Sequence, residues 1–202
     1  MVPVVNNVHS RYGFPDEVFE QRAPLVGQIT KKEIRAVSIH SLGLRPDSVL
    51  WDIGSGSGSV AIESSHIVTS GIVYAIEKDM KSIDILRNNV DNYGSGNVEI
   101  VVGEAPEVLD NLEDPDSIFV GGSGGSLKGI LELSRTRMKQ GGRIVVNLAL
   151  LERTQKVYDD MKALGFSSEL VMINASRSKE MLEGSLRLQA LNPVFIVTGT
   201  LN

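Results

Sequence analysis

Short runs of β-branched residues alternate with segments of helical spacing along most of this 202-residue chain. Repeated strand–helix units connect through right-handed crossovers, which build a parallel sheet with helices on both of its faces. We therefore expect an α/β fold with a doubly wound, mostly parallel, Rossmann-like sheet. The runs that predict its strands are Ser48–Ile53, Ile72–Glu77, Val98–Val102, Ser117–Val120, Arg143–Asn147, Glu169–Ile173 and Val194–Thr198.

The last two of these runs end the sheet differently from the others. About 20 residues separate them without a convincing crossover helix, so they are expected to form an antiparallel pair at the edge of a seven-stranded sheet. A capping box from Thr30 to Glu33 predicts a helix before the first strand, running to about Leu42. Other helices are expected after an Asp79 cap, over Ala105–Leu112, from Ile130 to Met138 and over Leu151–Leu164.

The composition is that of an ordinary globular protein, with 42% hydrophobic and 22% charged residues. We expect one domain over residues 1–202, with an N-terminal arm over residues 1–29. The absence of cysteine excludes disulfides and thiolate sites, and His9, His40 and His66 lack metal-ligand spacing, so no metal is expected. A net charge of −5 argues against a nucleic-acid partner. Without a membrane span or a signal-peptide pattern, a cytoplasmic protein is expected.

Three alternating glycines, Gly54, Gly56 and Gly58, follow the first expected strand. Ligands of open parallel sheets lie beyond the carboxyl ends of the strands, near the point where the strand order reverses. Glycines there allow positive φ and close approach of backbone to a ligand. The same frame, Gly56-x-Gly58-x-x-Ala61, also satisfies the loose dinucleotide fingerprint, and a tight turn without a ligand is a third interpretation.

Two acidic residues follow the next two strands. Glu77 ends the second strand, where a carboxylate can accept both ribose hydroxyls of NAD or of S-adenosylmethionine. Glu104, followed by Ala105, comes after the third strand and could bind the edge and amino group of an adenine. Each acid by itself is also typical of a solvated strand end or of the first turn of a helix.

The glycine turn, Glu77 and the Glu104-Ala105 pair resemble, in order and spacing, the class I S-adenosylmethionine-dependent methyltransferases. The position of Asp52, two residues before Gly54, and the antiparallel ending of the sheet favour this class over dinucleotide oxidoreductases. Amino-group methyltransferases commonly follow strand four with an acid or amide, two prolines and an aromatic residue. Here the fourth strand is followed by Gly121-Gly122-Ser123-Gly124-Gly125, which argues against methylation of an amine on RNA or protein.

A closer resemblance covers roughly residues 11 to 199. The chain resembles the decarboxylating precorrin methyltransferases of cobalamin biosynthesis, most specifically in Pro15–Phe19 and Gly121–Gly125. Further matching motifs are Thr30–Ala36, Asp52–Val60, Gly141–Asn147 and Asn192–Phe195. The resemblance implies methylation of carbon-15 of (cobalt-)precorrin-6B with decarboxylation of the ring-C acetate, and a homotetramer.

The resemblance and the motif positions together give a set of expected cofactor-binding residues for S-adenosylmethionine. Glu77 and Glu104 depart from the family because aspartate is common at both positions, so each carboxylate here reaches one methylene farther. Thr30 has two candidate roles, because it is also expected to cap the helix that follows it. The set comprises Thr30, Asp52, Gly54, Ser55, Gly56, Ser57, Gly58, Glu77, Glu104 and Ala105.

A tetrapyrrole substrate with many carboxylates is expected to meet cations near the strand ends, although solvated loop charges are the simpler interpretation of each cation. No catalytic nucleophile is expected, because positioning the substrate carbon against the sulfonium methyl supplies most of the acceleration. An RNA or protein methyltransferase, an NAD-dependent oxidoreductase and a non-catalytic cofactor sensor stay open as alternatives. The candidate substrate-binding residues are Arg11, Gly122, Ser123, Gly124, Asn147, Arg177, Lys179 and Arg187.

Overall fold

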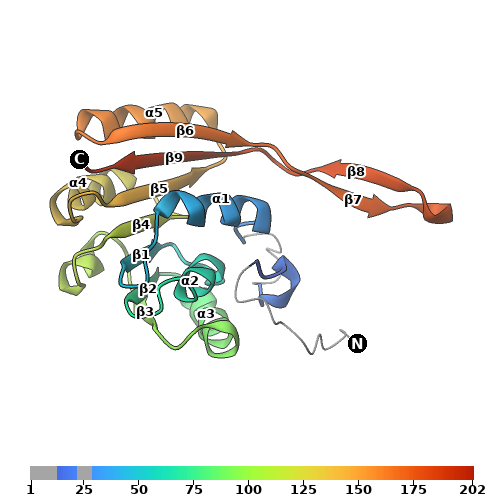
Figure 1. The fold of residues 1–202 in the computed structure, drawn as a ribbon, viewed down its shortest axis with the longest axis horizontal. Coiled ribbons are helices and arrows are strands. Elements are labelled where there is room, and N and C mark those ends of the chain that lie inside the picture. Colours follow the sequence, from blue (N-terminus) through green and yellow to red (C-terminus); the bar gives the residue numbers. More distant parts are fainter. Residues whose placement is uncertain (1–12, 22–28) are drawn as a thin grey trace.

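The structure of the chain is a computed structural model that describes residues 13–21 and 29–202. Its centre is a seven-stranded sheet with the strand order β3-β2-β1-β4-β5-β9-β6, from which a separate two-stranded hairpin extends (Figure 1). The sheet strands are β1 (Val49–Ile53), β2 (Ile72–Glu77), β3 (Val98–Val102), β4 (Ser117–Val120), β5 (Arg143–Leu148), β6 (Ser167–Ile173) and β9 (Val194–Thr200).

The pairing of the strands confirms the expected topology. β1 pairs in parallel with β2 and β4, and parallel pairing continues to β3 on one side and to β5 on the other. β9 lies antiparallel between β5 and β6, so the late antiparallel pair forms one edge of the sheet. Because the order reverses between β1 and β4, the carboxyl ends of these two strands flank the crevice where a ligand is expected.

Helices cover both faces of the sheet. One face packs against α1 (Lys32–Leu42), α2 (Ser59–Ser65) and α3 (Met80–Tyr93), and the other against α4 (Leu127–Arg137) and α5 (Leu151–Ala163). The expected Asp79 cap of α3 is confirmed, because its side chain accepts a hydrogen bond from the Lys81 amide. None of the helices in the described residues is both long and apolar enough to cross a membrane.

The start of α1 corrects one prediction. Thr30 does not cap the helix: α1 begins at Lys32, and its N-cap residue, Lys31, makes no side-chain capping bond. The carboxylate of Asp16, in the 3₁₀ turn η1 (Asp16–Val18), accepts the Lys32 amide at 2.9 Å instead. Glu33 does not complete a capping box, because its carboxylate binds Arg177. A charged group from a distant segment therefore replaces the local cap.

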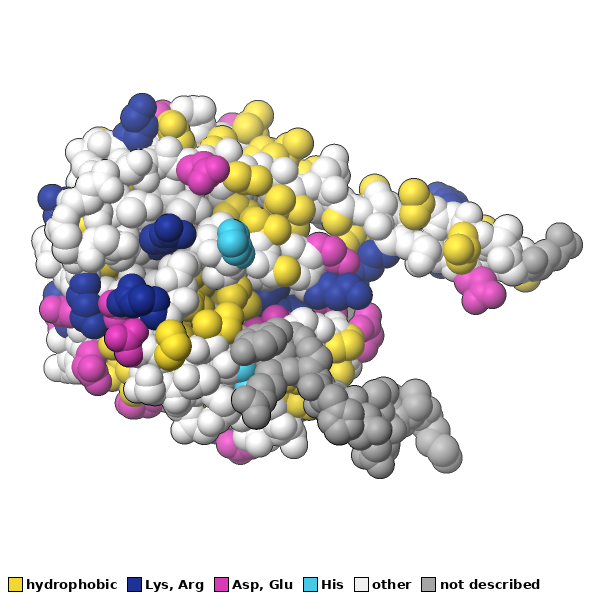
Figure 2. All heavy atoms as spheres, viewed as in Figure 1, with side chains coloured by type: hydrophobic (Ala, Val, Ile, Leu, Met, Phe, Trp, Pro, Cys, Tyr) yellow, Lys and Arg dark blue, Asp and Glu magenta, His cyan; other side chains and the backbone are white. Residues whose placement is uncertain are grey.

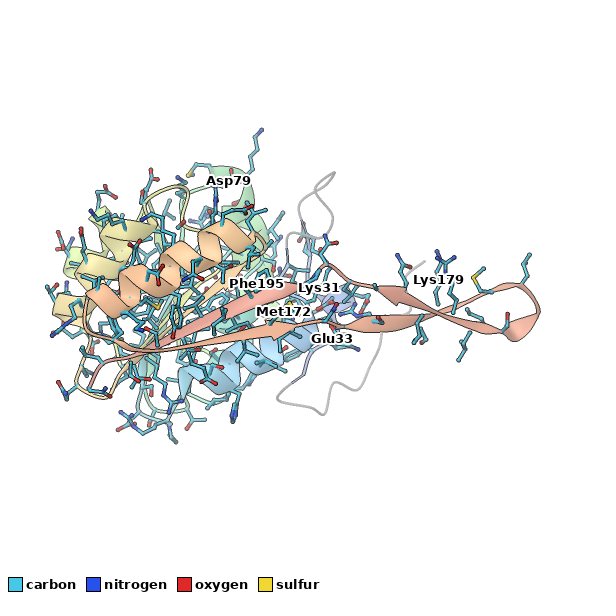
Figure 3. The ribbon with its side chains drawn as sticks, turned by 90° about the horizontal axis from the view of Figure 1, so that it is seen from above. Lys31, Glu33, Asp79, Met172, Lys179 and Phe195 are labelled. Atoms are coloured by element: carbon cyan, nitrogen blue, oxygen red, sulfur yellow. The ribbon has the colours of Figure 1, made fainter. Side chains whose placement is uncertain are left out.

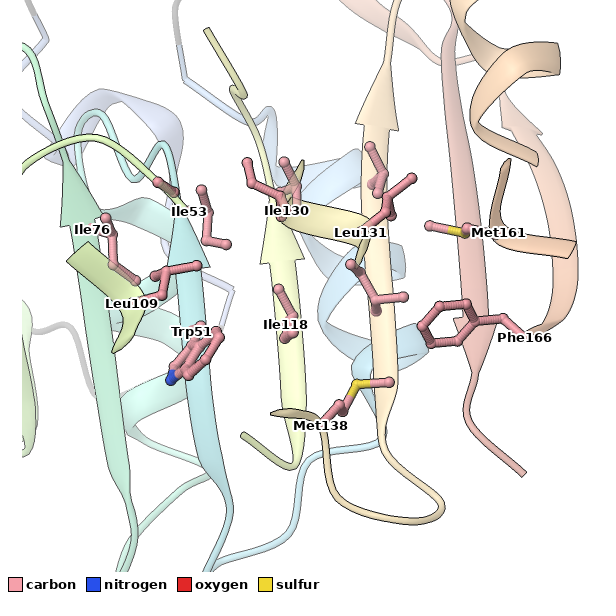
Figure 4. Close-up of a cluster of buried hydrophobic side chains, with 14 of the residues drawn as sticks. Trp51, Ile53, Ile76, Leu109, Ile118, Ile130, Leu131, Met138, Met161 and Phe166 are labelled. Atoms are coloured by element: carbon pink, nitrogen blue, oxygen red, sulfur yellow. The ribbon is translucent and has the colours of Figure 1, made fainter. Parts of the chain in front are cut away.

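The core lies in two layers, one on each face of the sheet. Figure 4 shows the layer beneath α4 and α5, where Trp51 and Ile118 of the sheet face Leu131, Met161 and other apolar side chains. This layer also buries Leu109 of the short helix expected over Ala105–Leu112, which is a 3₁₀ helix, η2 (Glu107–Asn111), rather than an α-helix. The opposite layer packs α1, α2 and α3 against the alternate side chains of the same strands.

A β-hairpin between β6 and β9 was not among the predicted strands. It consists of β7 (Ser176–Glu180) and β8 (Leu186–Ala190), joined through η3 (Leu182–Gly184), and it projects well beyond the sheet (Figure 1). The hairpin packs its flat surfaces against no helix in the described part of the chain, and nearly all of its residues are exposed. Its polar β7 sequence therefore lacks the apolar alternation by which half-buried strands are recognised.

Candidate functional site

A cavity of 860 Å³ opens at the carboxyl ends of the parallel strands, where the sheet order predicts a ligand site. This volume lies at the upper end of the range for small-molecule sites, roughly 300–1,000 Å³. The first turn of α1 and the base of the hairpin complete its wall. Its lining includes Ile29, Thr30, Lys31, Ile34, Gly54, Gly56, Glu77, Asp79, Gly103, Glu104, Ala105, Gly121, Gly122, Ser123, Gly124, Asn147, Ala175, Ala190, Leu191 and Asn192.

The glycine turn after β1 forms the floor of this cavity by direct contact of backbone with backbone. Gly54, Gly56 and Gly58 all have positive φ, of 73°, 57° and 79°. A Cβ atom at Gly54 would lie 2.3 Å from the carbonyl oxygen of Gly122, which follows β4. Only glycine fits there, so the two glycine-rich turns that the sequence singled out close against each other.

Glu77 stands at the end of β2, is almost fully buried, and holds the glycine turn. Its Oε2 accepts the Gly56 amide at 2.8 Å, and its Oε1 accepts the amides of Lys78 and Asp79, both at 2.8 Å. The carboxylate also lines the cavity. A carboxylate oxygen has room for a second hydrogen bond, so Oε2 can accept a ligand hydroxyl while it keeps the Gly56 amide.

Asp52 lies behind the glycine turn and does not line the cavity. It is fully buried: its Oδ2 accepts hydrogen bonds from Ser55 Oγ at 2.7 Å and from the Ala61 amide at 3.0 Å, and its Oδ1 has no partner. Burial raises the pKa of Asp52 to about 7, and the charge of nearby Glu77 adds to the rise. The structure therefore gives Asp52 and Ser55 a role in shaping the turn. Ser57 and Gly58 also lie outside the lining.

The turn after β3 supplies another part of the wall. Ala105 is buried and lines the cavity. Glu104 forms an ion pair with Lys78 across the cavity edge, and both side chains are about half exposed. Gly124 lies beside the end of the Lys78 side chain, and its φ of +56° favours glycine at this position. Gly122, Ser123 and Gly124 also line the cavity, and Gly124 lies beside Lys78 and Glu104.

Asn147, at the end of β5, lines the opposite part of the cavity. Its Nδ2 donates to Ser38 Oγ at 2.9 Å, and Ser38 Oγ lies 3.1 Å from Asn147 Oδ1, so its amide is held by α1. Thr30 also lines the cavity, and its carbonyl oxygen accepts from Arg35 at 2.6 Å. The structure thus brings Thr30 and Asn147 together with the glycine turns, as the sequence predicts.

The cations predicted to meet the substrate lie elsewhere. Arg177 is held by Glu33 and Asp16, Lys179 and Arg187 face each other across the hairpin, and the cavity lining contains none of the three. Figure 3 shows Lys31 and Glu33 at the base of the hairpin and Lys179 farther out along it. Arg11 lies outside the described residues. The hairpin carries these charges away from the strand ends, and their predicted contact with the substrate stays a prediction.

Lys31, Asp79 and Asn192 line the cavity although the sequence did not single them out. Lys31 is next to Thr30, the residue that was predicted to bind the cofactor. Asp79 was predicted only to cap a helix. Asn192 belongs to a motif that supported the family resemblance, but nothing local indicated that its chain segment returns from the hairpin to the cavity.

Residues 19–198 match a family described as "Precorrin methyltransferase domain". A relative from Sulfolobus acidocaldarius, named "Probable cobalt-precorrin-6B C(15)-methyltransferase (decarboxylating)", is 35% identical over 93% of this chain and 96% of its own. A Sinorhizobium relative, named "Precorrin-6Y C(5,15)-methyltransferase [decarboxylating]", is 36% identical, but the match covers 82% of this chain and 38% of the relative.

Solved structures agree with these sequence matches. The precorrin-6Y C5,15-methyltransferase of Geobacter metallireducens superposes with a TM-score of 0.89 at 36% identity, covering 95% of this chain and 99% of that one. The structure described as precorrin 8w decarboxylase from Methanobacterium thermoautotrophicum gives 0.85 at 31%, covering 92% and 98%. A Thermotoga maritima S-adenosylmethionine-dependent O-methyltransferase, at 0.71 and 21%, shares the fold.

Proposed function

The chain belongs to the family of precorrin methyltransferases, and from this premise we propose that it methylates carbon-15 of precorrin-6B or cobalt-precorrin-6B, with S-adenosylmethionine as donor, and releases the ring-C acetate carboxyl as carbon dioxide. The observation that carries the proposal is the cavity at the strand ends, which has Glu77 and two interlocked glycine turns in its wall. Methylation of carbon-5 is not part of the proposal, because the relative from Sulfolobus acidocaldarius, which matches over nearly its whole length, is named for carbon-15 alone.

The residues present fit S-adenosylmethionine. The Gly54–Gly122 contact leaves bare backbone at the cavity floor, and the Oε2 atom of Glu77 has capacity for a ribose hydroxyl. Glu104 and Ala105 line the region beyond β3, where the adenine would lie, and Thr30 lines the α1 side. When bound, this cofactor supplies a methyl group on a positively charged sulfur, which is a good leaving group.

The remaining role of the chain is to position the substrate and to exclude water. The part of the cavity between α1 and the hairpin base is lined mainly by apolar side chains, together with Lys31, Asn147 and Asn192. Asn147 is held by Ser38, so it presents its amide in a fixed direction.

We also propose that the protein is a homotetramer assembled through the hairpin. A two-stranded hairpin without a packed face is marginally stable in water, so a partner surface is expected. Register places Leu186 and Leu188 on one face of the ribbon, and both are more than 70% exposed. Light scattering of the purified protein tests this: the mass of four chains supports it, and a monomer that persists at micromolar concentration contradicts it.

The activity is tested by turnover. Purified protein is incubated with S-adenosylmethionine and precorrin-6B, with and without cobalt, and the products are weighed by mass spectrometry. We expect the gain of one methyl group and the loss of carbon dioxide, together with S-adenosylhomocysteine. Binding of NAD in calorimetry without binding of S-adenosylhomocysteine, methylation of RNA or protein instead of the corrinoid, or cofactor binding without any turnover would each contradict the proposal.

A further inference from the structure

Arg177 connects the hairpin to the body of the protein. Its Nε lies 2.8 Å from one carboxylate oxygen of Glu33, and its Nη2 lies 2.6 Å from the other, in the two-point geometry that a guanidinium allows. The same Nη2 is 2.7 Å from Asp16 Oδ2. Among the described residues, Arg177 is the one hairpin side chain with an ion pair to the body. Figure 2 shows basic and acidic side chains gathered beneath the base of the hairpin.

Asp16 carries this connection on to α1. Its side chain is almost fully buried, and while Oδ2 binds Arg177, Oδ1 accepts from the Lys32 amide at 2.9 Å and from Arg35 Nη1 at 3.1 Å. A carboxylate at this position satisfies an amide that the helix leaves free and interacts favourably with the helix dipole. Arg177 and α1 therefore share one carboxylate.

The segment that Asp16 and Glu33 hold is also a wall of the cavity. Ile29, Thr30, Lys31 and Ile34 line it, immediately before and within the first turn of α1. Arg35, which is fully buried, fixes the same segment from behind through the Thr30 carbonyl oxygen, at 2.6 Å. A continuous set of contacts thus runs from the hairpin through two carboxylates to the wall of the cavity.

We propose that Arg177 is a positioning residue that couples the hairpin to the cavity by holding residues 29–34 in the arrangement that binds the methyl donor. The proposal rests on the proposed function for the identity of that ligand. Such coupling is reciprocal: whatever displaces the hairpin changes affinity in the cavity, and a ligand in the cavity favours one placement of the hairpin.

The ion pair between Arg177 and Glu33 does not respond to pH under ordinary conditions. The hydrogen bonds from Arg177 lower the pKa of Glu33 to about 2, against the opposing effect of burial, and the carboxylates raise the pKa of Arg177 further above its ordinary range. Both groups therefore stay charged at any pH at which the protein is handled. Changes in the contact must come from movement of the hairpin.

The test compares S-adenosylhomocysteine affinity, by calorimetry, in the full-length wild type and in variants. Arg177→Met keeps most of the side-chain length and removes the charge, and it is expected to weaken binding about fivefold or more. Arg177→Lys, which cannot make the two-point contact, is expected to lie between this variant and the wild type. The matched control is Arg87→Met, which removes an exposed ion pair with Asp84 on α3 and should leave the affinity unchanged.

Hydrogen exchange separates positioning from simple stabilisation. In Arg177→Met, amides of residues 32–35 should exchange faster, while those of β1 and β4 keep the rates of the wild type. A lower melting temperature with unchanged affinity and unchanged exchange at α1 would overturn the proposal. If Arg177→Met does not fold, Glu33→Gln is used, because it leaves the Asp16 contact; a smaller loss of affinity supports the coupling and no loss overturns it. Failure of the wild type to bind S-adenosylhomocysteine would instead count against the proposed function.

Discussion

The two sides of the cavity are held by different kinds of interaction. On the side of β1, β2 and β4, backbone packs on backbone at Gly54 and Gly122, and Glu77 accepts amides from residues no more than 21 positions away. On the side of α1 and the hairpin, charged side chains make the contacts: Arg177 meets Glu33 and Asp16 across 144 and 161 residues of sequence.

This difference shows which side is rigid and which is adjustable. A backbone contact between two glycine turns has no rotamers and changes only if the strands move. The side of β1, β2 and β4, where the methyl donor is proposed to bind, is therefore preorganised. Ion pairs between long side chains can shift with the segment that carries them. We therefore expect substitutions on the side of β1, β2 and β4, the glycine side, to weaken binding more than substitutions on the side of α1 and the hairpin, the hairpin side.

The largest effect is expected from Gly54→Ala. A Cβ atom would clash with the Gly122 carbonyl at 2.3 Å, and φ is +73°, so one of the two turns must move. We expect S-adenosylhomocysteine binding to fall by about 100-fold or more in calorimetry, a loss of roughly 3 kcal/mol.

The control is Gly96→Ala, which has a similar positive φ of +90° but open space around the new Cβ. It should lose about 1 kcal/mol of stability for the backbone conformation and keep its affinity. Equal affinities of the two variants for S-adenosylhomocysteine would mean that the Gly54–Gly122 backbone contact does not shape the binding site.

A smaller effect is expected from Glu77→Gln. The substitution keeps the side-chain length but removes the charge and one acceptor from the group that binds the amides of Gly56, Lys78 and Asp79. Loss of a charged hydrogen-bond acceptor corresponds to about a tenfold weakening of S-adenosylhomocysteine binding. Glu152→Gln, on the exposed first turn of α5, serves as the control. Unchanged affinity in Glu77→Gln would show that Glu77 does not contribute to the binding of S-adenosylhomocysteine.

The last expected effect is on stability rather than on affinity, and it concerns pH and Asp52. Its folded pKa of about 7 exceeds the ordinary value of 3.8, so the folded state holds a proton that the unfolded state releases between those pH values. Stability from this group is therefore complete below about pH 4 and declines as the pH rises to about 7, by at most about 1.4 kcal/mol per pH unit.

Asp52→Asn removes this titration. In denaturant unfolding, the stability of the variant relative to the wild type should rise between pH 5 and pH 8. A difference that stays constant over this range would show that Asp52 is ionised in the folded protein, and the glycine side would then contain a second buried charge beside Glu77.

The sequence by itself determined the sheet, its antiparallel ending, the family and the glycine side of the cavity. These features depend on short-range patterns: strand–helix alternation, glycines that alternate after β1, and an acid at the end of β2. The Asp79 cap was predictable for the same reason, because donor and acceptor lie within two residues. Turns, caps and strand patterns of this kind depend on residues that are close neighbours in the sequence.

Only the tertiary structure decided how α1 is capped, where Arg177 points and that a hairpin leaves the sheet edge. The local signal at Thr30 predicted a capping box, but a distant carboxylate, Asp16, was better placed to accept the Lys32 amide. The hairpin has almost no buried residues in the described chain, and its first strand, β7, is polar throughout, so no half-buried strand pattern marks where it begins. Contacts between residues more than a hundred positions apart depend on the completed fold, and one sequence holds no local trace of them.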